Sequence, residues 1–365
     1  MNEKALGIIS ANYEIPGFGP LLKNRTLATL PFGARYRMID FALSNFTNAG
    51  IRTVGVITPY YYRSLMDHVG AGKPWGLDRV RGGLFIMPGT VYGEGMGKNR
   101  FLIKDLIRNK RILVSGEEKT VILCDTSCVL NADLADFIEA HEKSRCKVTF
   151  MYKHMASCPG RSVLGIENGI VKSIEEGDGA EGAVFLGIIA VNREYLLQLL
   201  EEYATVDYLD IFTVFRLGLG THRVSTYEFK AYAGMIDSLK EYERISGDLI
   251  AQKTTKELFE GERPIYTKTQ DGPPCRYKKG ASVKESIIAT GSVIEGTVEN
   301  SIIFRTVTVG KGAVIRNSII MQHSSIGEGA VVENAIFDKN VTVGAGKKVC
   351  GTPEEYIVLA KETKV

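Results

Sequence analysis

The chain has 365 residues, more than one hydrophobic core usually serves, so two domains are expected. Hydrophobic residues make up 44% and charged residues 24%, which is typical of a water-soluble globular protein. The formal charge is only +3, and Lys and Arg are scattered among Asp and Glu, which argues against a nucleic-acid-binding protein. No apolar run approaches the ~18 residues of a membrane helix, and six cysteines are too sparse for a disulfide framework. We therefore expect a cytoplasmic protein with neither nucleic acid nor membrane as a partner.

Strand and helix patterns alternate up to about Thr255, which predicts an α/β domain. The runs 148–152 and 184–191 are almost entirely apolar, as is typical of strands buried on both faces of a parallel sheet. In such a sheet we expect the working site at the carboxyl ends of the strands. The expected strands are 5–10, 54–58, 121–124, 148–152 and 184–191, and the expected helices are 64–69, 134–143 and 195–203.

After residue 272 the chain changes to a repeat in which Val or Ile recurs every five or six residues among small residues. Four copies begin at Val283, Val298, Ile315 and Val332, so the starts are 15, 17 and 17 residues apart. This period predicts a three-sided parallel β-helix, with apolar residues inside and small residues at the corners. The predicted organisation is an α/β domain over 1–255, a linker over 256–278 and the β-helix over 279–365. His323 is the one histidine of the repeats, and we expect it at a solvated corner rather than as a catalytic base.

The turn after the first strand is unusual. In α/β chains this turn is often glycine-rich, because phosphate oxygens reach backbone N–H groups only where no Cβ intervenes. Here residues 12–16 read Asn-Tyr-Glu-Ile-Pro, with bulk, a carboxylate and a proline that has no N–H. The sequence therefore predicts the first strand without the glycine-rich, phosphate-binding turn that often follows it.

The segment 31–58, PFGARYRMIDFALSNFTNAGIRTVGVIT, resembles the ADP-glucose pyrophosphorylases (glucose-1-phosphate adenylyltransferases), whose pattern is PFGGxYRxIDFxLSNxxNSGI. The resemblance implies a Rossmann-like nucleotidyltransferase domain with a mostly parallel sheet, followed by a left-handed parallel β-helix. In that family glucose-1-phosphate attacks the α-phosphorus of ATP in the presence of Mg²⁺. Arg35 and Arg37 precede a predicted helix that begins near Asp40, and we expect Asp40 to be a buried cap or ion-pair partner.

The chain departs from the family at the positions that carry catalysis. Aligned on the motifs GGxGxRL and RxKPA, the arginine of the loop becomes Gly17 and the lysine becomes Leu27. The metal-binding aspartate of GDHxYxMD becomes Ser127, and that of WRDVGT becomes Tyr232. Asp125 lies two residues before Ser127 and is a weak substitute. These degenerate positions predict no catalytic residue and no metal site in this chain, because a site without metal ligands cannot hold MgATP.

Within the family these losses resemble the GlgD-type regulatory subunits of Gram-positive bacteria. The resemblance implies a partner, the catalytic ADP-glucose pyrophosphorylase subunit, in a homo- or hetero-oligomer that we expect to be a tetramer. Mg²⁺ and ATP are then expected only for that partner, and this chain needs no cofactor. Two alternatives remain: an active adenylyltransferase that uses relocated groups such as Lys23, Asp125 and Asp133, and a stand-alone sensor of a sugar phosphate or nucleotide.

Arg25 and Arg37 match family positions that, in allosterically controlled members, help to bind an anionic effector near the junction of the domains. With Arg35 they are the candidates for an effector or anion site, and a phosphate or sugar phosphate is the expected ligand. The alternative is that these arginines form structural ion pairs. Arg305 and Arg316 of the repeats are candidates to close such a site from the other side.

Overall fold

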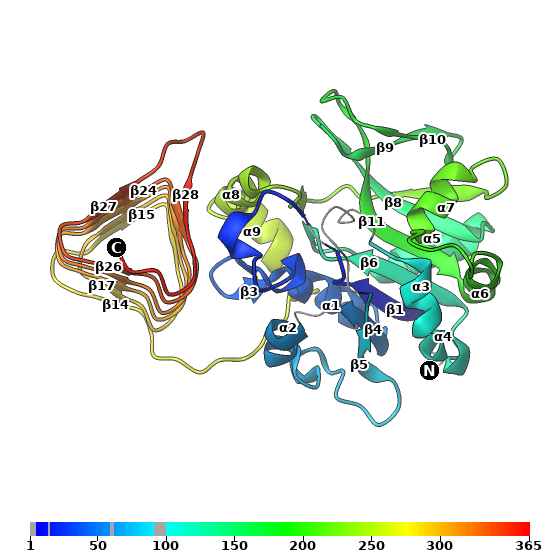
Figure 1. Ribbon diagram of the computed structural model, residues 1–365, viewed down its shortest axis with the longest axis horizontal. Coiled ribbons are helices and arrows are strands. Elements are labelled where there is room, and N and C mark those ends of the chain that lie inside the picture. The colour runs from blue at the N-terminus through cyan, green and yellow to red at the C-terminus, as the bar shows by residue number, and fades with distance from the viewer. Residues whose placement is uncertain (1–4, 14, 59–61, 91–99) are drawn as a thin grey trace.

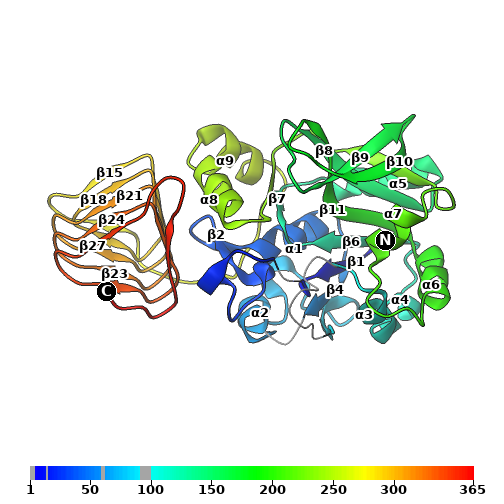
Figure 2. The same ribbon diagram turned by 45° about the horizontal axis from the view of Figure 1, so that its top comes forward.

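The computed structural model describes residues 5–13, 15–58, 62–90 and 100–365, and it divides into an α/β part and a three-sided prism (Figure 1). In a second view the coils of the prism stack on one another beside helices α8 and α9 (Figure 2). Residues 96–98, for which the sequence suggests a surface loop, lie outside the described residues. Within the described ranges no helix combines the length and the apolar character needed to cross a membrane.

A nine-stranded sheet forms the centre of the α/β part. Strands β5, β4, β1 and β6 are parallel, as expected, because each is followed by a crossover. β11 instead runs antiparallel to both β6 and β8, so the parallel pairing expected for the run 184–191 is wrong, although the run is buried. In order across the sheet the strands are β5 (Gly83–Pro88), β4 (Thr53–Thr58), β1 (Ala5–Ser10), β6 (Thr120–Asp125), β11 (Gly182–Asn192), β8 (Val148–Met155), β12 (Val224–Glu228), β10 (Ile170–Glu176) and β9 (Ser162–Glu167).

Helices cover both faces of this sheet, and each face has its own hydrophobic cluster. Residues of α1, α2 and α5 belong to the first cluster, and residues of α3, α4, α6 and α7 belong to the second. The two layers explain why the central strands read as continuous apolar runs. The helices are α1 (Met38–Asn48), α2 (Tyr62–Val69), α3 (Ile103–Arg108), α4 (Arg111–Ser115), α5 (Leu134–Ser144), α6 (Arg193–Glu202), α7 (Ile211–Leu217), α8 (Leu239–Asp248) and α9 (Gln252–Phe259).

Short elements complete the α/β part. They are the 3₁₀ helices η1 (Gly19–Leu21), η2 (Leu27–Thr29) and η3 (Lys73–Trp75), the hairpin of β2 (Pro31–Phe32) with β3 (Tyr36–Arg37), and the pair β7 (Cys128–Leu130) with β13 (Ala233–Met235). The predicted domain end at residue 255 falls inside α9, and the first strand of the prism begins at Arg276 within the predicted linker.

The prism is a parallel β-helix with three five-stranded faces. Val283, Val298, Ile315 and Val332 are in register on adjacent strands of one face, so the repeat read from the sequence is confirmed. His323 is exposed at a corner, as expected. The three faces are β14 (Arg276–Tyr277), β17 (Val293–Ile294), β20 (Thr308–Val309), β23 (Ser325–Ile326) and β26 (Thr342–Val343); β15 (Ser282–Lys284), β18 (Thr297–Glu299), β21 (Val314–Arg316), β24 (Val331–Glu333) and β27 (Lys348–Cys350); β16 (Ile287–Ile288), β19 (Ile302–Ile303), β22 (Ile319–Ile320), β25 (Ala335–Phe337) and β28 (Ile357–Leu359).

The third face of the prism and the α/β part share one hydrophobic cluster. The prism contributes Ile302, Ile319 and Ile336, and the α/β part contributes residues of α1, α8 and the segment between β1 and β2. Phe18 and Leu21 of that segment are among the least exposed side chains of the chain. The segment that follows β1 is therefore built into the contact between the two parts.

Candidate functional site

Tyr13 fills the space where a phosphate loop would follow β1. Its side chain is buried, and its hydroxyl forms a hydrogen bond of 3.0 Å with Thr126 Oγ1 and accepts one of 3.1 Å from the Thr126 N–H. Burial, together with the nearby Asp125 carboxylate, raises the pKa of the Tyr13 phenol far above its ordinary value, so the hydroxyl stays protonated. The turn after β1 is thus closed by an aromatic side chain bonded to the end of β6.

Asp125 ends β6, and both of its carboxylate oxygens have partners. Ser127 donates from its N–H (2.8 Å) and its hydroxyl (2.7 Å) to Oδ1, while Arg100 Nη1 forms an ion pair with Oδ2. Arg100 in turn lies over the ring of Tyr13, 5.5 Å from its centroid. Burial acts to lower the pKa of Arg100, but the Asp125 carboxylate outweighs it and the pKa is raised. Arg100 was not predicted, and no local sequence pattern marks it.

The two positions that correspond to metal aspartates do not face each other. Ser127 precedes β7 and Tyr232 precedes β13, and these strands pair antiparallel, so the residues lie at opposite ends of the pair. Four residues of ladder separate them, roughly 13 Å at about 3.3 Å per residue. The Tyr232 hydroxyl donates to Asp248 Oδ2 (2.9 Å) on α8 instead, a structural contact.

The two positions that correspond to the lysine and arginine of the family motifs, Leu27 and Gly17, lie in surroundings that do not suit a cationic site. Leu27 is 1% exposed and belongs to the cluster shared with the prism, where a lysine would bury an unpaired charge. Gly17 is exposed with φ +87°, a backbone conformation that favours glycine, and among the described residues, its two chain neighbours apart, nothing lies within 4 Å of where a Cβ would be. Neither position presents a cation to the end of β1.

Arg25 forms an ion pair between the two parts of the chain. Its Nη2 lies 2.5 Å from Asp338 Oδ2 of the prism, and both side chains are more than nine-tenths buried. Its Nη1 is buried without a hydrogen-bond partner among the described residues. Arg25 therefore links the two parts through Nη2, while its Nη1 is an unsatisfied hydrogen-bond donor among these residues.

Arg37 and Asp40 define the start of α1. Asp40 is fully buried, accepts a hydrogen bond from the Arg37 N–H (3.0 Å), and bonds through Oδ1 to His68 Nε2 (2.5 Å), so its role as a buried cap is confirmed. The Arg37 guanidinium donates to the carbonyl (2.6 Å) and hydroxyl (3.0 Å) of Ser64. Arg35 is exposed and lies over the Tyr36 ring at 5.3 Å.

A cationic cluster forms where the prism meets Arg25 and Arg37. Burial above all, and then Arg37 and Arg25, lower the pKa of Lys339 to about 7, which the single nearby carboxylate of Asp338 does not offset. Burial also lowers the pKa of Arg37 to about 10, with Arg25 adding to the effect. We call Arg25, Arg37 and Lys339 the junction cluster.

The corner of the prism at this junction carries a column of stacked residues. Backbone hydrogen bonds join successive coils there, from His323 N–H to Arg305 O and from Asn340 N–H to Gln322 O. Arg305, Gln322 and Lys339 therefore follow one another along the corner at the 17-residue period of the repeat. Burial lowers the pKa of Arg305, and Arg35 lowers it further; its charged and polar neighbours Arg35, Asp40 and Tyr36 all belong to the α/β part, so Arg305 lies on the junction side. The repeat period was a signal that could have located Lys339.

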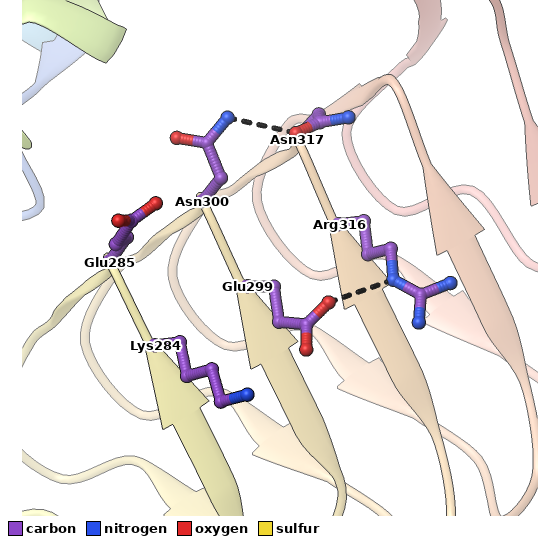
Figure 3. Close-up of a pocket in the computed structure, with 6 residues that line it drawn as sticks. All are labelled: Lys284, Glu285, Glu299, Asn300, Arg316 and Asn317. Atoms are coloured by element: carbon purple, nitrogen blue, oxygen red, sulfur yellow. Dashed lines mark hydrogen bonds and ion pairs between the residues drawn. The ribbon is translucent and has the colours of Figure 1, made fainter.

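Arg316 lies elsewhere, at the opposite end of a different face of the prism. It donates to Glu299 (2.9 Å) and Glu333 (3.0 Å) on the adjacent coils, so of the two candidates it is not the one that lies beside the junction cluster. Figure 3 shows this region, a shallow hollow of about 620 Å³. Asn300 donates there to Asn317 (2.8 Å), and these contacts within the hollow are typical of cross-strand stabilisation rather than of a ligand site.

Known proteins resemble both parts of the chain. The nucleotidyl transferase family matches residues 18–176, and the GlmU-like C-terminal hexapeptide family matches residues 275–356, which identifies the prism as a left-handed parallel β-helix. A glycogen biosynthesis protein GlgD from Geobacillus stearothermophilus is 36% identical over 86% of this chain and 84% of its own length. The GlgD protein of Bacillus subtilis (strain 168) is 34% identical over 86% and 83%, and a glucose-1-phosphate adenylyltransferase of Clostridium perfringens (strain 13 / Type A) is 28% identical over 86% and 82%. The chain therefore belongs to the GlgD glycogen biosynthesis proteins, a branch of the glucose-1-phosphate adenylyltransferase family.

Proposed function

We propose that this chain is a catalytically silent regulatory and assembly subunit of ADP-glucose pyrophosphorylase in glycogen biosynthesis, working in the cytoplasm. The observation that carries the proposal is the closed end of β6, where Asp125 is paired with Arg100 and Tyr13 fills the place of the phosphate loop. Phosphoryl-type transfer is catalysed mainly by positioning and by neutralising charge on phosphate oxygens. Here the carboxylate is neutralised internally, and Leu27 leaves a hydrophobic side chain in place of a cation.

The partner in this proposal is a catalytic glucose-1-phosphate adenylyltransferase subunit, and the assembly is an oligomer, most simply a tetramer. The two-part architecture supports such a role, because the shared hydrophobic cluster joins the β-helix to the α/β part, so that both can contribute to one surface. The family relationship supports it as well, since both GlgD proteins and adenylyltransferases are similar to the chain over most of its length.

The test is enzymatic and uses the whole chain. Alone, with ATP, glucose-1-phosphate and Mg²⁺, it should form no ADP-glucose; a turnover above ~1 s⁻¹, the low end of ordinary enzymes, would contradict the proposal. Mixed with the catalytic adenylyltransferase of the same organism, it should elute with that subunit and change its rate or its response to effectors. Separate elution together with unchanged kinetics would reject the assembly role.

We further propose that the junction cluster binds an anionic effector, a phosphate or a sugar phosphate. Arg25 keeps a buried, unpartnered Nη1, and Arg37 and Arg25 repel a charged Lys339 more than the Asp338 carboxylate attracts it. An anion would satisfy the unused donor and relieve this repulsion. Because the cluster contains side chains from both the α/β part and the prism, an anion there would act on their contact.

Anion binding should depend on pH through Lys339. With a pKa of about 7, Lys339 is mostly protonated at about pH 6 and mostly neutral at about pH 8. At the higher pH the side chain must take up a proton when an anion binds, so the affinity for the anion should fall about tenfold from pH 6 to pH 8. Sulfate is the suitable probe, because its own charge is constant in this range, and isothermal titration calorimetry is the measurement. A Lys339→Gln variant should bind sulfate more weakly and without this pH dependence, while Arg316→Gln, at another corner, should match the wild type. Equal affinities of the wild type at both pH values would contradict the prediction.

A further inference from the structure

The end of β6 has a buried carboxylate whose neutralising charge comes from the chain itself. The Asp125 side chain has no exposed surface, whereas that of Arg100 is 26% exposed. A buried carboxylate without a compensating cation is strongly destabilising, so some positive charge is required at this point of the fold. In the described residues that charge is the Arg100 guanidinium.

Arg100 is held in place from both strand ends. The hydroxyl of Ser10, the last residue of β1, donates to the Arg100 carbonyl, and the Tyr13 ring lies beneath the guanidinium. Tyr13 is itself tied to Thr126, next to Asp125. The arginine therefore connects the ends of the two neighbouring strands at which a nucleotidyltransferase would hold its metal-bound nucleotide.

The residues at this position do not fit Mg²⁺. This ion requires near-octahedral oxygen coordination and keeps several waters. Asp125 Oδ1 accepts two hydrogen bonds from Ser127, and Oδ2 meets Arg100. The backbone of Gly187 on β11 closes the remaining side, because a Cβ there would lie only 2.0 Å from Oδ2. Across the described ranges, no three His, Cys, Asp or Glu side chains gather in a way that could hold a metal ion.

We infer that Arg100 is a built-in replacement for the divalent cation of the family site. The guanidinium supplies the positive charge that a bound metal would supply to a carboxylate at this strand end, and it does so without nucleotide. The site is then charge-balanced in the free chain, so the α/β fold does not depend on metal. This inference rests on the proposed loss of catalysis, but its test measures stability and metal response without turnover, so either can fail alone.

The experiment compares melting temperatures with and without millimolar Mn²⁺, with Mg²⁺ as a second probe. The wild type should not respond. Arg100→Ala exposes Asp125 and should melt at a lower temperature, and Mn²⁺ should raise its melting temperature by about 3 °C. Arg100→Ala/Asp125→Asn, which removes both charges, should recover stability relative to Arg100→Ala and lose the response to Mn²⁺.

The response of the wild type to Mn²⁺ is the first measurement that can contradict this assignment of Arg100. A saturable rise of the wild-type melting temperature in Mn²⁺ that is lost in Asp125→Asn would overturn it, and this measurement does not require the alanine variant to fold. Arg100→Lys keeps a positive charge and should remain insensitive to Mn²⁺. A folded Arg100→Ala chain with no response to Mn²⁺ would likewise overturn the idea that the guanidinium occupies a cation position. Arg161→Lys, at another ion pair, should stay unresponsive and serves as the control.

Discussion

Replacing Asp338 with asparagine should lower the free energy of unfolding by about 3–5 kcal/mol. Asp338 is 1% exposed and is the carboxylate partner of Arg25, whose guanidinium would remain buried and unpaired in the variant. The pKa of Lys339, already lowered by burial and then by Arg37 and Arg25, would fall further, because the Asp338 carboxylate favours its charged form. Urea denaturation followed by circular dichroism measures the change.

The control for this variant is Asp271→Asn, which changes an exposed carboxylate in the segment before the prism and should alter stability by less than about 0.5 kcal/mol. An Arg25→Met/Asp338→Leu double variant removes both charges and should recover most of the loss, since well-packed apolar residues often replace a buried pair at little cost. A loss under about 1 kcal/mol for Asp338→Asn would show that water reaches Arg25 and that the pair is not a buried link between the two parts.

Restoring the four family residues should not restore catalysis. A Gly17→Arg/Leu27→Lys/Ser127→Asp/Tyr232→Asp variant is expected to stay more than about 100-fold below ~1 s⁻¹ in ADP-glucose formation. Tyr13 and Arg100 would still fill the space of the phosphates and metal, and the positions 127 and 232 lie at opposite ends of the β7–β13 pair. A coupled assay of pyrophosphate release measures the rate.

Two further variants define this prediction. Leu27→Lys alone buries a charge in the shared cluster and should be destabilised, so circular dichroism must show that the fourfold variant is folded before its rate is read. Adding Tyr13→Gly and Arg100→Ala to the four changes should give the first measurable binding of MgATP. A fourfold variant that reaches ~1 s⁻¹ while Tyr13 and Arg100 are intact would contradict our account of the closed site.

Periodicity predicted most of the fold because it reports which faces of an element are buried. The strand at 5–10 and the coils that begin at Val283, Val298 and Ile315 are found where the apolar pattern placed them. The direction of β11 was not predictable in this way. A strand covered by helices on both faces is apolar whether its neighbours run parallel or antiparallel, so burial carries no information about direction.

At the candidate site the sequence could mark positions that differ from the family motifs, but not the side chains that surround them in the fold. Comparison with a motif shows that Ser127 stands at an expected aspartate, but it does not show which side chain then neutralises Asp125. Arg100 reaches that carboxylate from 25 residues earlier in the chain, a contact that only the folded sheet creates. The position of Lys339 was easier to predict, because the 17-residue period aligns it with Arg305 and Gln322. Which corner of the prism faces the α/β part could be learned only from the structure.

The ion pair between Arg100 and Asp125 also affects how easily metal binding at this site could evolve again. Loss of Arg100 alone strands the buried Asp125 carboxylate at a cost of about 3–5 kcal/mol, a large share of the 5–15 kcal/mol that keeps a typical domain folded. A lineage that drifted back toward metal use would have to pass through such a weakened intermediate, or change several residues at once. If catalysis has been lost as we propose, the pair acts as an evolutionary ratchet: selection for folding alone would keep the arginine in place and the site closed.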